Sequence, residues 1–333
     1  MSKLFSELTV GGVTFKNRAW VSPMCQYSAV NGLIQDWHAV HYGAFITGGA
    51  GLVMVEASAV HPDGRISEFD SGIWTDQQAQ VLAEIPRFAH RQGTKAGIQL
   101  SHAGRKASAQ TPWNGGAQIL ATEGGWQSVA PSALAFEGFT EPSELSLADI
   151  ALLRADFVAA AERAVSADFD VIEIHSAHGY LLHEFLSPIS NKRTDEYGGS
   201  FENRIRLLCE IASYVRLIVP ASHGLFVRIS ASDWIDGGWT VEESTEFAAR
   251  LKAACANFIH VSSGGISRQQ QIAIGPDYQV PFAQAIKVES DIAVAAVGAI
   301  TDPHQAQEII NSNKADAVFL ARAMIRNPRW AMA

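Results

Sequence analysis

Short apolar runs recur along the chain, and each is followed by a loop or by a segment with apolar residues at helical spacing. Runs of this length that are rich in β-branched residues predict buried strands. Helical periodicity is clearest over residues 77–91, 147–167, 201–219 and 241–254, which begin beside the capping residues Thr75, Ser146, Ser200 and Thr240. The predicted strands cover residues 18–21, 52–56, 96–100, 171–175, 225–229, 258–262, 292–297 and 317–320. Alternation of eight strands with helices predicts an α/β protein, a (β/α)8 TIM barrel in which residues 1–333 form a single domain.

Two segments depart from the plain repeat. Residues 8–15 carry the pair Gly11-Gly12 between alternating apolar positions, which predicts an N-terminal β-hairpin that caps the bottom of the barrel. Residues 106–142 form a long loop after the third strand, at the end of the barrel where loops build active sites, and we expect this loop to act as a substrate cap. The sequence stops about one helical turn after the eighth strand, so we also expect a C-terminal tail to be missing.

Composition narrows the range of partners. Lys and Arg total 25 and Asp and Glu total 34, and the net charge of −9 comes without a basic run, so nucleic acid and acidic membranes are poor partners. We therefore expect small-molecule ligands. The 3 cysteines are far apart and form no CxxC pair, which argues against disulfides and iron–sulfur clusters. No segment has the apolar length of a membrane span or the pattern of a secretion signal, so a cytoplasmic protein is predicted.

Candidate chemistry lies where the predicted strands end, because barrel enzymes build their sites at that end. Glycines follow the sixth and seventh strands and Arg322 follows the eighth, and together they offer backbone N–H groups and a guanidinium to a phosphate monoester. Taken singly, these glycines would be ordinary tight turns. Small or polar residues mark the ends of all the strands: Ser22, Pro23, Met24, Cys25, Tyr27, Ala57, Gln99, His175, His178, Tyr180, Arg228, Ser263, Gly264, Gly298, Ala321 and Arg322.

The two histidines after the fourth strand allow two interpretations. His175 and His178 can both donate to one carbonyl oxygen if the loop turns back over the strand end, which would polarise a conjugated alkene. They could instead bind a metal together with His183 and Glu184, as in a metal-dependent barrel hydrolase. Such hydrolases need ligands from several strand ends, and the sequence has no acid or Lys at the matching ends of strands three to six. We therefore predict no metal.

Four segments together resemble the Old Yellow Enzyme family of FMN-dependent ene-reductases. They are Ser-Pro-Met-Cys-Gln-Tyr at 22–27, Gln-Leu-Ser-His-Ala-Gly-Arg at 99–105, Glu-Ile-His-Ser-Ala-His-Gly-Tyr at 173–180 and Asn-Lys-Arg-Thr-Asp-Glu-Tyr-Gly-Gly at 191–199. The likeness extends over residues 4–328, and Cys25 with Tyr27 is similar to the bacterial thermophilic-like or xenobiotic-reductase branch. Two features depart from the family: Ala321 stands where a glycine is usual, and the tail that often reaches a neighbouring subunit's active site has no counterpart.

The resemblance implies noncovalent FMN, with its phosphate at Gly298 and Arg322 and its ring over the loop after the first strand. Gln99 would pair with the pyrimidine edge, and Arg228 would lie near N1, where a fixed positive charge stabilises the reduced ring. The alternative for Arg228 is an ion pair with a nearby acid such as Asp233. The full set of implied FMN contacts is Ser22, Pro23, Met24, Cys25, Ala57, Gln99, His175, Arg228, Ser263, Gly264, Gly298, Ala321 and Arg322.

The same resemblance implies an NAD(P)H-dependent oxidoreductase with a ping-pong sequence. Hydride would pass from N5 of reduced FMN to the β-carbon of an enone, enal or maleimide, and nitro compounds are further candidates. His175 and His178 would bind the carbonyl oxygen, Tyr180 would protonate the α-carbon, and Tyr27 would help to polarise the carbonyl. Cys25 would tune the flavin potential. NADPH or NADH would bind transiently over the flavin, in a homodimer or homotetramer.

Two other functions are compatible with parts of the sequence. A flavin-storing or sensor protein could keep the fold without alkene turnover, although His175, His178 and Tyr180 argue for catalysis. A Rossmann dehydrogenase is disfavoured because its glycine-rich turn follows a strand, whereas the glycines of residues 48–51 precede one.

The predicted entrance to the site carries positive charge and an aromatic ring. Arg105 and Lys106 follow the third strand, and Trp113 lies a few residues further along the same loop. These three residues are candidates to line the entrance and to meet the phosphates of the nicotinamide nucleotide.

Overall fold

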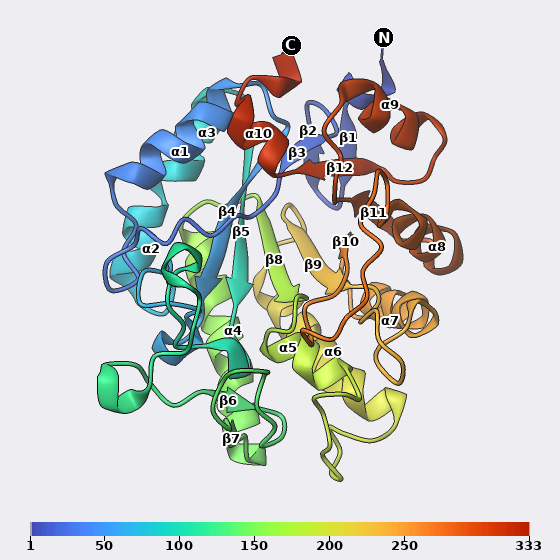
Figure 1. Cartoon of the computed structure of the whole chain (residues 1–333). Coiled ribbons are helices and arrows are strands. Elements are labelled where there is room, and N and C mark those ends of the chain that lie inside the picture. The colour runs from blue at the N-terminus through green and yellow to red at the C-terminus, as the bar shows by residue number, and fades with distance from the viewer. Residues whose placement is uncertain (1, 333) are drawn as a thin grey trace.

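The computed structural model describes residues 2–332, and its eight barrel strands confirm the order that the apolar runs predict (Figure 1). Each strand pairs in parallel with the next one, and the last pairs with the first, so the barrel is closed. The long strands in the middle of Figure 1 point downward, so the carboxyl end of the barrel is its lower end in this view. They are β3 (Ala19–Val21), β4 (Leu52–Ala59), β5 (Lys95–Ser101), β8 (Val171–Ser176), β9 (Gly224–Ser230), β10 (Phe258–Ser262), β11 (Ala293–Ala296) and β12 (Ala317–Leu320).

Helices cover the outside of the barrel (Figure 1). Four of them begin at the predicted caps, where the side-chain oxygen of Thr75, Ser146, Ser200 or Thr240 accepts a hydrogen bond from the backbone N–H three residues later. The helices are α1 (Asp36–Thr47), α2 (Asp76–Leu82), α3 (Glu84–Arg91), α4 (Leu147–Ser166), α5 (Leu181–Leu186), α6 (Phe201–Ile218), α7 (Val241–Ala253), α8 (Val280–Ser290), α9 (Pro303–Asn311) and α10 (Arg322–Arg326).

The single helix predicted over residues 77–91 is wrong, because α2 and α3 are separated there by a turn at Ala83. Pro86 explains the interruption. It has no N–H to donate to the carbonyl of Leu82, and its ring crowds that carbonyl, so a continuous helix is broken one turn before the proline. The other three predicted helices, now α4, α6 and α7, are confirmed with ends that differ by one residue.

The predicted hairpin closes the amino-terminal end of the barrel, where β1 (Leu8–Val10) pairs with β2 (Val13–Phe15). Phe15 of β2 packs against the barrel interior, where its ring centroid lies 4.5 Å from that of Trp20. Trp20 packs in turn against three further buried rings, those of Phe226, Phe258 and Phe319. These aromatic side chains fill the amino-terminal half of the barrel, so room for polar groups and ligands remains at the carboxyl end.

The long loop after β5 extends below the carboxyl ends of the strands in Figure 1. It contains short turns of 3-10 helix, among them Pro112–Asn114, and two short paired strands, β6 (Val129–Ala130) and β7 (Ser143–Glu144). Trp113 in this loop is 68% exposed. The loop therefore lies at the end where a substrate cap is expected, and its action on a substrate stays a prediction.

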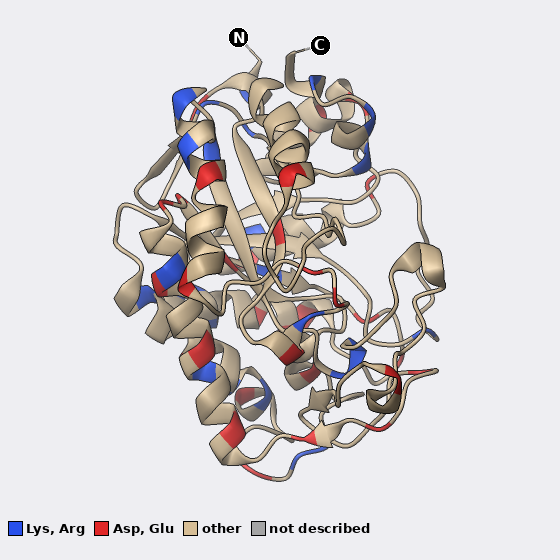
Figure 2. Ribbon diagram, turned by 90° about the vertical axis from the view of Figure 1, so that its left-hand side faces the viewer, with Lys and Arg blue, Asp and Glu red and all other residues tan. Residues whose placement is uncertain are grey.

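Charged residues of both signs are interspersed along the outer helices, as Figure 2 shows for one side of the molecule. A mixed surface of this kind agrees with the net charge of −9 and offers no extended cationic track on the side that the figure presents. Over residues 2–332, the helices are all too short or too polar to cross a membrane.

Candidate active site

Polar side chains face into the barrel on the carboxyl side of the aromatic rings. Because side chains alternate along a strand, Glu173 and His175 share the inner face of β8, and His260 and Ser262 share that of β10. The strand register places Arg228 of β9 beside His175 on one side and beside His260 on the other. This polar layer lies at the end of the barrel where enzymes of this fold bind their ligands.

The segment after β8 turns back over the strand end, which is what two donors at one carbonyl require. His178 and Gly179 both have left-handed backbone, with φ of 61° and 72°. A Cβ on Gly179 would lie 2.1 Å from the carbonyl oxygen of Gly265, so only glycine fits there. The turn brings the predicted residues together: the ring centroid of His175 lies 5.2 Å from that of His178 and 5.2 Å from that of Tyr180.

Hydrogen bonds define which ring nitrogens of the two histidines can donate. Nδ1 of His175 accepts from the backbone N–H of Ala177 at 3.2 Å, so the neutral ring carries its proton on Nε2. Nε2 of His178 lies 2.8 Å from the hydroxyl oxygen of Ser262. The Ser262 hydroxyl can donate here or to Oε1 of Gln279 at 3.4 Å. When it donates to His178, the shorter contact, Nδ1 of His178 carries the proton and can donate to a ligand.

The side chains of this cluster are uncharged near pH 7. Burial, and after it the charge of Arg228, lowers the pKa of His175 and of His178 well below the ordinary value, so both rings are neutral near pH 7. Burial also raises the pKa of Tyr180, so the phenol stays protonated. Each of the three side chains therefore presents an N–H or O–H to its surroundings and carries no charge.

Arg105 and Lys106 follow β5 and donate to backbone carbonyls of neighbouring segments. Their predicted place at the entrance is therefore wrong. The buried Arg105 guanidinium donates to two of these carbonyls. Lys106 donates from Nζ to the carbonyls of His178 at 2.8 Å and Gly265 at 3.0 Å, and Nζ lies 5.1 Å from the centre of the Tyr180 ring. Burial lowers the pKa of Lys106 to about 8. Helix and strand patterns carry no signal for such contacts, because the carbonyls come from distant segments.

A buried carboxylate, which the sequence analysis missed, organises the polar layer. Glu173 is fully buried, accepts from Nε2 of Gln99 at 2.7 Å, and lies 3.0 Å from Nδ1 of His260. Burial, and then the charge of Arg228, lowers the pKa of His260 to about 4. The signal that could have found Glu173 and His260 is a polar residue two positions from another in an otherwise apolar strand, which places both on the inner face.

Arg228 is buried at the carboxyl end of β9, and its Nε has no hydrogen-bond partner among residues 2–332. The alternative ion pair with Asp233 is wrong, because that carboxylate contacts His183, Ser187 and the backbone of Trp239 instead. Burial lowers the pKa of Arg228, but a guanidinium stays charged in proteins. A buried cation with a free N–H is costly on its own, and it fits the electron-rich edge of a bound flavin.

The loop after β3 brings Cys25 and Tyr27 to the same end of the barrel. The ring of Tyr27 meets that of Trp113 edge-on, with 5.6 Å between the centroids, and the place of Trp113 at the entrance stays a prediction. Burial, then the carboxylates of Asp70 and Glu56, raises the pKa of the Cys25 thiol well above its ordinary value. Burial raises the pKa of Tyr27 as well. Cys25 is therefore a thiol near pH 7, which agrees with a role that forms no covalent intermediate.

Gln279, which the sequence did not indicate, ties together the loops after β10 and β11. Its Oε1 accepts from the hydroxyl of Ser263 at 2.6 Å, and its Nε2 donates to the carbonyl of Val297 at 3.1 Å. A Cβ on Gly298 would lie 2.1 Å from Nε2 of Gln279, so this position requires glycine. Gly264 and Gly298 both have positive φ, 72° and 97°, and leave the backbone open to a phosphate group.

The other predicted cofactor residues lie at the carboxyl ends of the strands. Arg322 begins α10 and is exposed, and Ala321 before it has a φ of −114°, so this position does not use the positive φ that favours glycine. The hydroxyl of Ser22 is buried and has no partner within residues 2–332. Residues that follow β3 or lie within β4 complete the set, namely Pro23, Met24 and Ala57.

His183 and Glu184, the other members of the alternative metal site, make contacts of their own. Nε2 of His183 lies 3.0 Å from the Asp233 carboxylate, and Glu184 accepts from the backbone N–H of Arg105 at 2.9 Å. Across the described residues, 2–332, no three His, Cys, Asp or Glu side chains are placed to hold a metal ion.

Comparison with known proteins places the chain in a family. The model of the NADH:flavin oxidoreductase / NADH oxidase family matches residues 3–333. An NADH:flavin oxidoreductase of Gibberella zeae is 48% identical over 346 residues, which cover 98% of this chain and 84% of the relative. An NADPH dehydrogenase of a Geobacillus species is 46% identical over 333 residues, which cover 99% of this chain and 93% of the relative.

Solved structures give the same result. Morphinone reductase is similar with a TM-score of 0.82 at 26% identity, covering 99% of this chain and 88% of that one. The Old Yellow Enzyme homologue from Zymomonas mobilis has a TM-score of 0.82 at 27% identity, with 99% and 91% covered. These likenesses confirm the predicted barrel and the resemblance drawn from the motifs. The chain belongs to the NADH:flavin oxidoreductase / NADH oxidase family and is an NAD(P)H-dependent FMN oxidoreductase of the Old Yellow Enzyme type.

Proposed function

We propose that the enzyme is an ene-reductase that adds hydride to the β-carbon and a proton to the α-carbon of α,β-unsaturated carbonyl compounds. The observation that carries this proposal is the cluster of His175, His178 and Tyr180, which brings two neutral imidazole donors and a protonated phenol together. Two N–H donors at one carbonyl oxygen stabilise the negative charge that develops there when hydride arrives. Enones, enals and maleimides all carry such an oxygen, and nitro compounds offer a similar acceptor.

The cofactor fits the polar layer beside this cluster. FMN supplies the hydride when it is bound. Arg228 would direct its free Nε to the flavin ring, and Gln99, whose amide is oriented by Glu173, would present its carbonyl and second N–H to the pyrimidine edge. The open backbone at Gly298 and the exposed Arg322 would hold the phosphate.

The nicotinamide nucleotide would use the same donors as the alkene. A solved structure of morphinone reductase, 26% identical to this chain, is a complex with tetrahydroNAD. A carboxamide carbonyl can accept from His175 and His178 as an enone carbonyl can, which supports a ping-pong sequence in which the two ligands occupy one position in turn. The homodimer or homotetramer and the cytoplasmic location stay predictions.

Anaerobic reduction followed by reoxidation tests the proposed function. NADPH is expected to bleach the flavin absorbance, and cyclohexenone is expected to restore it while cyclohexanone forms. A storage or sensor protein could be reduced but would not pass the hydride to the alkene. A colourless protein that takes up no FMN, or a reduced enzyme that cyclohexenone leaves unchanged, would refute the proposal.

Replacement of Tyr180 by Phe is expected to slow enone reduction by about 10²-fold, the lower end of what a general acid contributes, because solvent can partly replace the phenol. Affinity for a phenolic ligand should stay within about threefold, since both histidine donors remain. Stopped-flow oxidation and a binding titration separate the two effects. Tyr214→Phe, on the outer surface of α6, is the matched control. An equal loss in rate and in affinity would contradict the assignment.

The rate of enone reduction is expected to be constant near pH 7 and to fall as the pH rises through about 8. Lys106, with a pKa lowered by burial to about 8, carries its charge below that pH, and the charge beside the Tyr180 ring favours departure of the phenolic proton. His175 and His178 stay neutral across this range, because their pKa values are lowered. Lys106→Met should abolish the alkaline limb. Lys16→Met, at the opposite end of the barrel, should retain it.

A further inference from the structure

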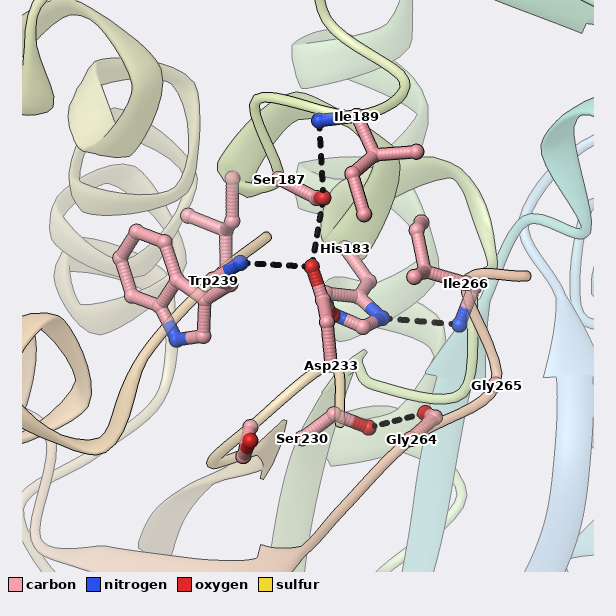
Figure 3. A network of polar contacts seen from close by, with 12 residues as sticks. His183, Ser187, Ile189, Ser230, Asp233, Trp239, Gly264, Gly265 and Ile266 are labelled. Carbon is pink, nitrogen blue, oxygen red and sulfur yellow. Dashed lines mark hydrogen bonds and ion pairs between the residues drawn. The ribbon is translucent and has the colours of Figure 1, made fainter. Parts of the chain in front are cut away.

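A buried carboxylate and histidine lie directly behind the left-handed turn that carries the site. Asp233, in the loop after β9, and His183, on α5, are both fully buried, and Nε2 of His183 lies 3.0 Å from Oδ1 of Asp233. Figure 3 shows Asp233 enclosed by His183, Ser187 and Trp239. Neither residue has a role in the proposed reaction, and the sequence analysis considered His183 only as a metal ligand.

The hydrogen bond from the turn defines the protonation of His183. The backbone N–H of Gly179 donates to Nδ1 of His183 at 2.8 Å. A backbone N–H can only donate, so Nδ1 must be unprotonated and the proton of the neutral ring must be on Nε2. That nitrogen faces Asp233, which therefore selects the tautomer that Gly179 needs.

The second oxygen of Asp233 is held by two donors, and one of them, a backbone N–H, can only donate. Oδ2 accepts from the backbone N–H of Trp239 at 2.7 Å and from the hydroxyl of Ser187 at 2.6 Å. Burial alone would raise the pKa of Asp233, but the contacts with His183, Ser187 and Trp239 outweigh it and lower the pKa. The carboxylate is therefore ionised and held in one orientation, with Oδ1 toward His183.

The turn depends on such support because its backbone is unfavourable without it. His178 is not a glycine, yet it has a φ of 61°, a conformation that L-residues rarely adopt. One neighbouring N–H, that of His178, donates to the hydroxyl of Ser230, which in turn donates to the carbonyl of Gly264. The N–H of Gly179 has only His183 as its acceptor in the described chain. Loss of that acceptor would leave a buried N–H unsatisfied within the turn.

We propose that Asp233 and His183 are positioning residues, which act through the Gly179 N–H to hold His178 and Tyr180 in the geometry that binds a ligand oxygen. The proposal rests on the proposed function only in naming what the held residues do. Asp233 does not touch substrate or cofactor in this scheme. It determines which ring nitrogen of His183 carries the proton. That tautomer lets Nδ1 accept from the Gly179 N–H and so holds the turn.

Asp233→Asn tests this directly. The backbone N–H of Trp239 requires an acceptor, so the amide oxygen of the new side chain must face Trp239 and its NH2 group must face His183. An NH2 group donates to Nε2 and moves the ring proton to Nδ1, where it confronts the N–H of Gly179. A carboxylate-to-amide change has the same effect on the tautomer in a catalytic triad.

The first measurement is binding of p-hydroxybenzaldehyde to FMN-loaded enzyme, followed by the change in flavin absorbance. Asp233→Asn is expected to weaken the affinity about tenfold, as loss of a well-placed hydrogen bond predicts, with FMN content unchanged. Asp170→Asn is the matched control, because Asp170 also contacts a histidine, Nε2 of His90 at 2.8 Å, but at the amino-terminal end of the barrel. Its affinity should equal that of the wild-type enzyme. Equal losses in both variants, or no loss in Asp233→Asn, would overturn the proposal.

A second variant separates tautomer from general structure. In His183→Asn the side-chain amide oxygen can take the place of Nδ1 as the acceptor for Gly179, and it has no tautomer to select. Asp233→Asn should therefore have little further effect on affinity in the His183→Asn background. A loss as large as in the wild-type background would show that Asp233 acts by packing alone.

A spectroscopic measurement covers the case in which the variants do not fold. In the wild-type holoenzyme labelled with 15N-histidine, NMR is expected to show His183 with a proton on Nε2 and none on Nδ1. A proton on Nδ1 would overturn the proposal without any variant. Neither the NMR result nor phenol binding depends on alkene turnover. The ene-reductase proposal can therefore fail in the cyclohexenone test while the positioning role of Asp233 and His183 is still supported.

Discussion

His178→Ala is expected to oxidise with cyclohexenone about 10²-fold more slowly than the wild-type enzyme, while it retains its FMN. One donor of the pair is lost, and a single donor to a developing oxyanion is worth roughly 3 kcal/mol. Binding of phenols should weaken too, since a phenolate oxygen would use the same two N–H groups. FMN should remain, because the predicted flavin contacts include His175 but not His178.

Stopped-flow oxidation of the NADPH-reduced enzyme and a titration with p-hydroxybenzaldehyde measure the two effects. His178→Asn is the informative companion, because Asn tolerates the left-handed φ of 61° and carries an amide N–H, so it should recover much of the rate. His223→Ala, just before β9 at the opposite end of the barrel, should behave as wild type. Unchanged enone kinetics in His178→Ala would contradict the assignment of this donor.

Arg228→Met is expected to lower the flavin reduction potential and to weaken FMN binding. The guanidinium is buried and has a free Nε, so its charge acts on a bound ring with little screening by water. Loss of about 2–4 kcal/mol of stabilisation of the more negative state corresponds to roughly 45–90 mV in a two-electron couple. The variant should therefore be reduced less completely by NADPH at equilibrium.

Equilibrium titration against a redox dye gives the potential, and the FMN content after gel filtration gives the retention. Arg228→Lys keeps the charge but not the planar fork, so it should retain most of the potential while losing affinity. Met at this position also leaves Glu173 with Gln99 and His260 as partners, so the carboxylate stays hydrogen-bonded and the fold should survive. A potential that is the same in Arg228→Met and the wild-type enzyme would place the flavin ring elsewhere.

The barrel could be predicted from the sequence because its determinants are local. Each strand is a short apolar run, and four helices begin at a Ser or Thr whose side chain bonds three residues ahead. The central part of the site is local as well, since His175, His178 and Tyr180 lie within six residues and need only one turn to meet. Pro86 shows the limit even here, because periodicity alone does not register a missing N–H.

The remainder of the site depends on contacts between distant segments. The carbonyl of His178 is held by Lys106, Gln279 joins two successive loops, and Nε2 of His183 lies 3.0 Å from the Asp233 carboxylate. Sequence spacing does not reveal these partners. Arg105 and Lys106 illustrate the resulting error: cations in a predicted active-site loop were assigned to a ligand, but the structure directs them to backbone carbonyls.

The aromatic side chains that fill the amino-terminal half of the barrel, from Phe15 of the hairpin to Phe319 of β12, leave no room for a ligand at that end. In the proposed function, the reductant and the alkene would therefore both enter at the carboxyl end, near Tyr27 and Trp113, and each would leave before the other could bind. An excess of either ligand would then inhibit binding of the other. The hairpin, although remote from the site, would in this way favour alternation of the two proposed half-reactions.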